Sequence, residues 1–167
     1  MKKVAVIMGS DSDLPVVEKA INTLQEFGVP MEVRVCSAHR TPEEASRFAR
    51  NAAAEGFGVL IAAAGLAAHL AGALAANTTL PVIGIPMAGG VWDGLDALLS
   101  TVMMPPGVPV ATVGVGGAVN AALLAVQILA VSDQSLTEKL AAYKRAAAEK
   151  VRKKDLAIQE KYNLIKV

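Results

Sequence analysis

Lys3-Val4-Ala5-Val6-Ile7-Met8, followed by Gly9-Ser10-Asp11-Ser12-Asp13, is the stretch of sequence that decides the fold. Its first part is short, apolar and rich in β-branched residues, and it ends at a glycine, as buried strands often do. The small polar residues lead into Leu14–Phe27, where Pro15 stands in the first turn and apolar residues follow helical spacing. A buried strand that enters a helix through a short loop is the basic unit of a parallel α/β sheet.

The same unit repeats along the chain. We expect further strands near Met31–Cys36, Val59–Ala63, Pro81–Ile85 and Pro109–Gly114. We expect the accompanying helices near Pro42–Glu55, Ala67–Ala76, Leu95–Val102 and Ala118–Val131. This alternation predicts an α/β fold with a parallel five-stranded sheet that is covered by helices on both faces.

The length of 167 residues suits one domain. We expect a single domain over residues 1–167, with a core of about 3–131 and a C-terminal helix of about 135–160. Ser135 and Glu138 have the spacing of a capping box at the start of that helix. The alanine-rich helices of so small a domain suggest contacts between subunits.

Charge and cysteine content argue against several kinds of partner. The 16 basic and 15 acidic residues give a formal charge of +1, and aromatic residues make up 4%, so we expect no nucleic-acid partner. One cysteine and two separated histidines do not form a metal site, so we expect no metal. The first residues show no cleavable signal pattern, which favours a cytoplasmic location.

Two uncharged stretches, Gly56–Ala76 and Val108–Val131, have about the length that spans a bilayer. Each divides into an apolar run, a glycine-containing break and a run of alanine and leucine. That division is typical of a strand, a turn and a buried helix. We therefore expect no membrane span.

Ligands of open parallel sheets bind beyond the carboxyl ends of the strands, where loops enter the helices. Five unusual loops fall at such ends, and we expect them to converge on one crevice. They are Gly9–Asp13, Ser37–Thr41, Ala64–Leu66, Met87–Gly94 and Val115–Gly117.

The first loop offers small residues just before a helix, whose free N–H groups and partial positive charge suit a phosphate. An alternative is that Ser12 or Asp13 simply caps the helix. Asp11 and Asp13 argue against a pure phosphate site. A carboxylate there could hold ribose hydroxyls, which leaves the phosphate to Ser10 and the backbone.

The second loop, Ser37-Ala38-His39-Arg40-Thr41-Pro42, brings histidine and arginine to a helix entrance. Thr41 and Glu44 have capping-box spacing, with proline at the first helical position. Arg40 is suited to bind a phosphate in bidentate fashion, and His39 is suited to proton transfer near neutral pH. The alternative is a surface pair without a role.

Three further side chains are harder to assign. His69 lies in an apolar, helix-like run, where we expect a hydrogen-bonded core residue rather than a catalyst. Cys36 is most simply a buried strand residue. Trp92 could be a wall of the ligand site, a subunit contact or a core residue, and the sequence does not rank these.

Several segments together resemble the class I carboxyaminoimidazole ribonucleotide mutases of purine biosynthesis, also called the catalytic subunit of phosphoribosylaminoimidazole carboxylase. The similarity runs in order from about Lys3 to about Leu129. It is carried by Met8–Asp13, Ser37–Pro42, Ala67–Leu70, Leu80–Gly84, Gly94–Ser100 and Met104–Thr112.

This resemblance implies a flavodoxin-like three-layer sandwich that assembles as a homo-octamer. It implies an isomerase that converts N5-carboxyaminoimidazole ribonucleotide into its C4-carboxylated isomer without a cofactor, by release and re-addition of carbon dioxide. His39 matches the histidine that shuttles the proton. The positions expected to bind the ribonucleotide are Ser10, Asp13, Ser37, Arg40, Gly65 and His69.

The chain also departs from the family pattern. Leu66 and Ala71 stand where many members have glycine and proline, and Met87–Asp93 lacks a common serine-containing stretch. Arg40, in place of the lysine common in the class II carboxylases, favours the mutase. Two alternatives stay open, namely a class II carboxylase that uses free carbon dioxide and a non-catalytic binding module or assembly scaffold on the same fold.

Overall fold

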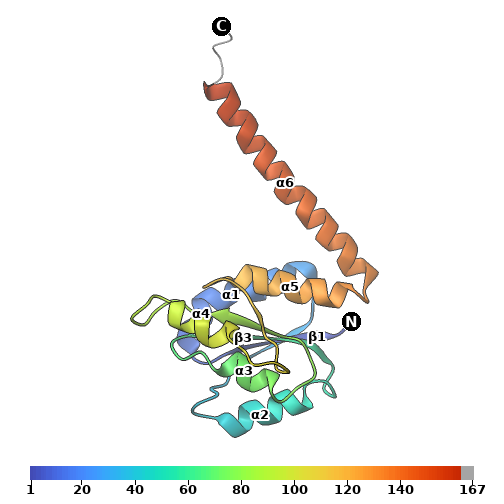
Figure 1. The fold of residues 1–167 in the computed structure, drawn as a ribbon. Coiled ribbons are helices and arrows are strands. Elements are labelled where there is room, and N and C mark those ends of the chain that lie inside the picture. Colours follow the sequence, from blue (N-terminus) through green and yellow to red (C-terminus); the bar gives the residue numbers. More distant parts are fainter. Residues whose placement is uncertain (163–167) are drawn as a thin grey trace.

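The computed structural model describes residues 1–162 and contains one parallel five-stranded sheet (Figure 1). The order of strands across the sheet is β2-β1-β3-β4-β5, and every neighbouring pair is parallel. This is the order of flavodoxin-like folds, so the expected fold class is confirmed. The strands are β1 (Lys3–Met8), β2 (Met31–Val35), β3 (Phe57–Ala64), β4 (Val82–Pro86) and β5 (Ala111–Thr112).

The helices follow the strands in the expected order, and the bounds of α1 and α4 agree with the sequence prediction to the residue. The helices are α1 (Leu14–Phe27), α2 (Pro42–Asn51), α3 (Leu70–Ala75), α4 (Leu95–Val102), α5 (Ala118–Ala130) and α6 (Gln134–Tyr162), with a 3-10 turn η1 (Asp11–Asp13) before α1. None of the helices in residues 1–162 is both long and apolar enough to cross a membrane.

Three elements are shorter than predicted, namely α2, which ends at Asn51 instead of Glu55, α3 and β5. The helix expected from Ala67 begins only at Leu70, because residues 66–69 form tight turns in which backbone N–H groups bond to carbonyls two residues earlier. The strand expected over Pro109–Gly114 has two ladder residues. Pro109 has no N–H to donate to a ladder, and strands with proline pair poorly at that position.

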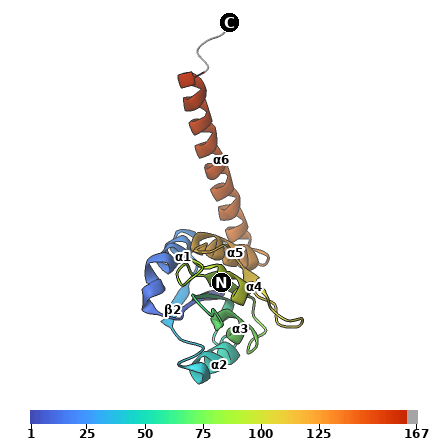
Figure 2. The ribbon, with the colours of Figure 1, turned by 60° about the vertical axis from the view of Figure 1, so that its left-hand side comes forward.

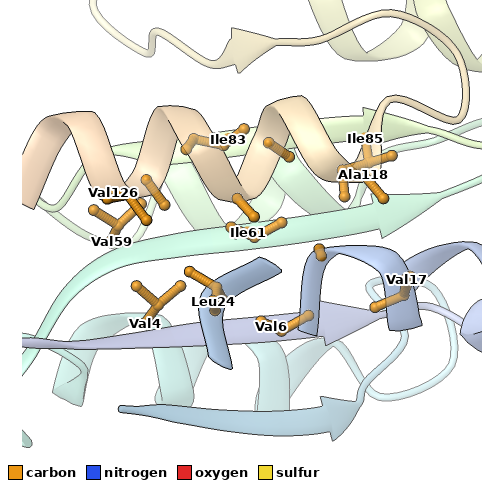
Figure 3. Packing of buried hydrophobic residues seen from close by; sticks show 14 of the residues in the cluster. Val4, Val6, Val17, Leu24, Val59, Ile61, Ile83, Ile85, Ala118 and Val126 are labelled. Atoms are coloured by element: carbon orange, nitrogen blue, oxygen red, sulfur yellow. The ribbon is translucent and has the colours of Figure 1, made fainter. Parts of the chain in front are cut away.

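Side chains of the central strands alternate between two apolar layers, as period-two geometry requires. On one face, Val4 and Val6 of β1 pack with residues of α1 and α5 (Figure 3). On the other face, Ala5 and Ile7 pack with α2 and α3. Burial of each large aliphatic side chain stabilises the fold by roughly 1.5–3 kcal/mol, so both layers hold the sheet rigid behind its loops.

The last helix leaves the body of the molecule (Figures 1 and 2). The capping box expected at Ser135 and Glu138 is wrong, because α6 begins one residue earlier and Asp133 caps it. The Asp133 Oδ1 atom accepts from the backbone N–H groups of Ser135, at 3.0 Å, and Leu136, at 3.3 Å. The Ser135 hydroxyl also donates to this Oδ1 atom, at 2.7 Å, and this bond is the largest cause that lowers the pKa of the Asp133 carboxyl, with the backbone bonds adding to it.

Only the first turns of α6 touch the body. Leu136 is buried in the core, and the ammonium of Lys139 donates to the carbonyl of Phe27 at 2.7 Å, where it satisfies the C-terminal end of α1. The ring of Tyr143 lies 5.6 Å from that of Phe27. Beyond Tyr143, every described residue of the helix is exposed.

Candidate functional site

A pocket of about 690 Å³ lies beyond the carboxyl ends of β1 to β4. Four of the five expected loops line it, with contributions from Gly9–Asp13, Ser37–Arg40, Ala64–His69 and Met87–Gly90. The crevice predicted from the positions of the loops is therefore present. Its walls come from segments that are far apart in the chain and are brought together by the parallel sheet.

The fifth loop, Val115–Gly117, does not line this pocket, so the prediction of five converging loops was wrong in this part. The backbone N–H of Gly116 instead donates to the carbonyl of Pro86 at 2.9 Å. The Val115 side chain lies so close to Gly94 that a Cβ at Gly94 would be 2.7 Å from it. The loop thus packs against the β4–α4 segment without lining the pocket.

The second loop is held by hydroxyl groups. The Thr41 hydroxyl accepts from the backbone N–H of Ser37 at 3.1 Å and donates to the carbonyl of the same residue at 3.0 Å. The Ser37 hydroxyl accepts from the backbone N–H of Arg40 at 3.1 Å. These bonds close the loop on itself and fix the backbone that carries His39.

The capping box predicted for this loop is therefore wrong. Thr41 precedes α2, but its hydroxyl is committed to Ser37 and makes no cap bond to the helix. Glu44 lies toward a separate groove between β2 and α2. The helix still begins at Pro42, because proline has no N–H that would need a partner there.

His39 and His69 meet inside the pocket. The Nε2 atom of His39 lies 2.7 Å from the Nδ1 atom of His69, and the two rings are nearly perpendicular, at 77°. His69 immediately precedes α3 and is exposed, so the expectation of a core histidine was wrong. The apolar run around it suggested burial, but the late start of α3 turns this side chain toward His39.

The short distance between the two facing nitrogens limits which of them carries a proton. A hydrogen bond at 2.7 Å needs one nitrogen to donate and the other to accept, so only one of the facing nitrogens carries a proton. If His39 donates through Nε2, its Nδ1 is left with a lone pair that is able to take a proton. The contact therefore couples the tautomer of His39 to that of His69.

Arg40 reaches across to the first loop. Its Nη2 atom donates to the carbonyl of Gly9 at 3.2 Å, so the guanidinium lies beside Ser10 and the end of β1. Arginine presents planar donors that match a phosphate. The predicted neighbours Ser10 and Arg40 therefore do come together, because β1 and β2, which their loops follow, are adjacent in the sheet.

The first loop contains a cap, but not the one expected. The Ser10 hydroxyl accepts from the backbone N–H of Ser12 at 3.3 Å and caps η1, whereas Asp13 makes no side-chain cap bond to α1. Partial burial raises the pKa of the Asp13 carboxyl, and a hydrogen bond from the Ser10 backbone offsets part of this effect. Asp13 is thus a carboxylate that still lacks a strong partner in the pocket.

Of the remaining candidate residues, one lies where it was expected and two do not line the pocket. Gly65 lines the pocket as expected, between Ala64 and Leu66. Cys36 was expected to be a buried strand residue, but it follows β2 and is only half-buried, with its sulfur 3.6 Å from the Thr41 hydroxyl. Trp92 is 64% exposed, which excludes a core position, and it is not among the residues that line the pocket.

Met87 and Ala88 also line the pocket, within the loop Met87–Gly94 that was expected to reach it, although neither was named as a site residue. Among residues 1–162, no group of three or more His, Cys, Asp or Glu side chains lies close enough together to hold a metal ion.

Comparison with known proteins agrees with this geometry. The chain is 55% identical over 157 residues to the N5-carboxyaminoimidazole ribonucleotide mutase of Mycobacterium leprae, which covers 94% of this chain and 92% of that protein. It is 56% identical over 144 residues to the Pyrococcus abyssi protein of the same name, covering 86% of this chain and 83% of that one. The crystal structure of Treponema denticola PurE superposes with a TM-score of 0.85 at 29% identity, covering 93% of this chain and 98% of that one.

A longer relative shares the same segment. The phosphoribosylaminoimidazole carboxylase of Saccharomyces cerevisiae is 55% identical over 137 residues, which are 82% of this chain but 24% of the yeast protein. The family model described as AIR carboxylase matches residues 3–150, which include the whole sheet and every loop of the pocket. The chain belongs to the AIR carboxylase family.

Proposed function

We propose that this protein is an isomerase that interconverts N5-carboxyaminoimidazole ribonucleotide and 4-carboxyaminoimidazole ribonucleotide, as the names of its relatives from Mycobacterium leprae and Pyrococcus abyssi state for those proteins. The observation that carries the proposal is the hydrogen-bonded pair of His39 and His69 in a pocket that also contains an arginine. Such a reaction needs an anion site at one end and a proton carrier at the other.

The anion end of the pocket is formed by the first two loops. We assign the phosphate of the ribonucleotide to Ser10 and Arg40, which lie together where β1 ends. Asp13 is suited to accept hydrogen bonds from ribose hydroxyls, because its carboxylate is partly buried in the same wall. Ser37, Gly65 and His69 complete the lining near the base.

The chemistry then requires one proton to move from a carbon to a nitrogen. When the carbamate bond breaks, its electron pair returns to the exocyclic nitrogen, which takes a proton from His39, and carbon dioxide is released. The ring carbon C4 then adds to carbon dioxide, and His39 takes the proton that C4 loses. His39 returns to its starting protonation state, so no oxidant, reductant or second substrate is needed.

A turnover assay tests the proposal. Purified protein is given either the carbamate ribonucleotide or aminoimidazole ribonucleotide with bicarbonate, and formation of the C4-carboxylated product is measured for each. We expect product from the carbamate without added bicarbonate. Product from aminoimidazole ribonucleotide and bicarbonate, with none from the carbamate, would assign the chain to the carboxylase alternative. The name of the yeast relative states that activity for the yeast protein.

The non-catalytic alternative makes a different prediction. A binding module or scaffold on this fold would bind the ribonucleotide without turnover, and His39→Asn would change nothing that can be measured. The position of His39 inside the pocket and its bond to His69 favour the enzyme, because neither group serves the apolar core.

The assembly expected for the protein is a homo-octamer in the cytoplasm. The support from the structure is α6, which has 29 residues but buries only Leu136 and leaves Val151, Leu156 and Ile158 exposed (Figure 2). An isolated helix of this kind gains most of its stability from packing on another surface. Light scattering tests the size, which should be eight times the 17.2 kDa of one chain.

A further inference from the structure

β2 forms one margin of the sheet, with β1 on one side and no strand on the other among residues 1–162 (Figure 2). The carbonyl of Pro30 accepts from the N–H of Val4 at 2.9 Å, and the N–H of Cys36 donates to the carbonyl of Met8 at 2.9 Å. Backbone groups alternate in direction along a strand, so the even-numbered residues of this segment bond to β1. The odd-numbered residues point their N–H and C=O groups to the open edge, and they are Met31, Val33 and Val35.

This open edge is suited to pairing with another strand. β2 contains neither a proline nor a bulge, two features that commonly protect edge strands. The residues whose backbone groups face outward have apolar side chains, and Val33 and Val35 are 40% and 58% exposed. The edge therefore offers free donors and acceptors beside apolar side chains that a neighbouring strand would cover.

The two charged residues of β2 lie on its other face, one on each side of Val33. The guanidinium of Arg34 lies over the ring of Phe48 in α2, 5.4 Å from its centroid, and Glu32 forms an ion pair with Lys3 at 3.4 Å. The side chains of Glu32 and Arg34 remain 40% and 53% exposed. Both are therefore within reach of a strand that pairs with the edge.

We propose that the edge of β2 binds the edge of β2 in a second copy of this chain, antiparallel about a twofold axis at Val33, so that the two sheets become continuous. In this register Glu32 lies opposite the partner's Arg34, and Arg34 lies opposite the partner's Glu32. Both are non-hydrogen-bonded pairs, in which opposing side chains approach most closely. Opposite charges at such positions stabilise the pairing of strands.

The charges select both the register and the occupant. A pairing centred at Glu32 would place that carboxylate opposite itself, and a pairing centred at Arg34 would do the same with the guanidinium. Like charges directly opposite each other destabilise a sheet. A twofold contact uses the same surface of both copies, and the register centred at Val33 makes this strand complementary to itself. The contact goes beyond the proposed function, because neither charged residue lines the pocket of His39 and His69.

Two charge reversals in the full chain test the pairing. Arg34→Glu gives a strand with two acidic residues and Glu32→Arg gives one with two basic residues, so each variant repels a second copy of itself. Loss of a twofold contact should lower the mass measured by light scattering roughly twofold or more. An equimolar mixture of the two variants places opposite charges together at both positions, and it should regain the wild-type mass.

Hydrogen exchange resolved to single amides identifies the contact directly. The outward amides of β2 exchange freely in a single copy, whereas a paired strand protects them. We expect them to exchange about tenfold more slowly or more in the wild type than in either single variant, and to become slow again in the mixture. The amides concerned are those of Met31, Val33 and Val35.

Two further variants separate pairing from other effects, and circular dichroism should show the same fold in both. Arg50→Glu makes the same change of charge on α2, at a residue that bonds to Asn77 of its own chain, and it should leave mass and exchange unchanged. Val33→Pro removes a donor that faces the open edge and is not used by β1. It should lower the mass as Arg34→Glu does.

Three results overturn the inference. The first is a wild type whose outward β2 amides exchange as fast as those of Arg34→Glu. The second is a mixture of the two charge variants that does not regain the wild-type mass. The third is an Arg50→Glu protein that loses mass as Arg34→Glu does, because the effect would then come from net charge. These measurements are made without substrate, so failure of the proposed function is a separate outcome.

Discussion

The imidazole of His39 and that of His69 are 30 residues apart in the chain, yet Nε2 of the first lies 2.7 Å from Nδ1 of the second. Each comes from a different loop at the carboxyl edge of the sheet, one after β2 and one after β3. In the strand order, β1 lies between those two strands. The contact therefore spans the position of β1, above the loop in which Ser10 and Asp13 face the same pocket.

Replacement of His39 tests its assignment as the proton carrier. We expect His39→Asn to lower kcat by roughly 10²–10⁴, the usual contribution of general acid–base catalysis. Affinity for the ribonucleotide should change little, because we assign its phosphate to Arg40 and Ser10. Rapid-quench turnover and calorimetry measure the two quantities. A variant with full kcat would remove His39 from the reaction.

His69 is assigned a positioning role, and a pair of variants separates that role from packing. The amide oxygen of asparagine is able to accept the hydrogen bond of His39 in place of Nδ1, whereas leucine has no acceptor. We expect His69→Leu to lower kcat about tenfold more than His69→Asn, with similar KM for both. Equal kcat values in both variants would show that the hydrogen bond has no catalytic role.

The phosphate assignment predicts a KM effect at Arg40. A hydrogen bond to a charged group contributes roughly 1.5–3 kcal/mol, so Arg40→Met should raise KM by about 10- to 150-fold. Arg50 provides a matched control, because it lies on α2 and bonds to Asn77 outside the pocket. Arg50→Met should leave KM unchanged in the same steady-state assay. An equal rise in both variants would point to a nonspecific charge effect.

Asp13 predicts a dependence of stability on pH. Burial raises the folded-state pKa of this carboxyl, so ionisation above that pKa costs stability, and the cost disappears as the pH falls below the unfolded-state value of 3.8. We expect Asp13→Asn, measured without substrate, to raise the thermal midpoint at pH 7. The gain over the wild type should shrink toward pH 4. A gain that grows toward acid pH would mean that the pKa is lowered instead.

The exposed part of α6 predicts an effect on assembly. A chain that ends after Ala146 keeps Leu136, Lys139 and Tyr143, which contact the body. We expect the body of this shortened chain to keep its fold, as judged by far-UV circular dichroism. We expect it to form a smaller assembly than the full chain. Light scattering at several protein concentrations measures the size. An unchanged size would mean that the assembly does not depend on the exposed helix.

Much of the fold could be predicted because it depends on local pattern. The run Val4–Met8 is apolar without interruption, and strands buried on both faces have this composition. Leu14–Phe27 has its proline in the first turn and Gly28, with a φ of +70°, at its end. Such signals lie within a few residues of the feature that they determine.

The two wrong capping-box predictions share a different cause. Thr41 and Ser135 both had the spacing of a capping box, but the hydroxyl of Thr41 bonds to Ser37, and Asp133 caps α6 in place of Ser135. A spacing rule cannot choose between acceptors that are all nearby, because the choice depends on the path of the backbone.

The sequence by itself determined the strand–loop–helix order, the two apolar layers and the presence of reactive side chains in loops at the carboxyl edge of the sheet. Only the tertiary structure decided which of those side chains meet. The pairing of His39 with His69, the reach of Arg40 to Gly9 and the contact of Leu66 with Gly90 join segments that are distant in the chain. Local pattern arises from interactions within a few residues, whereas these contacts depend on the strand order and on where each loop turns.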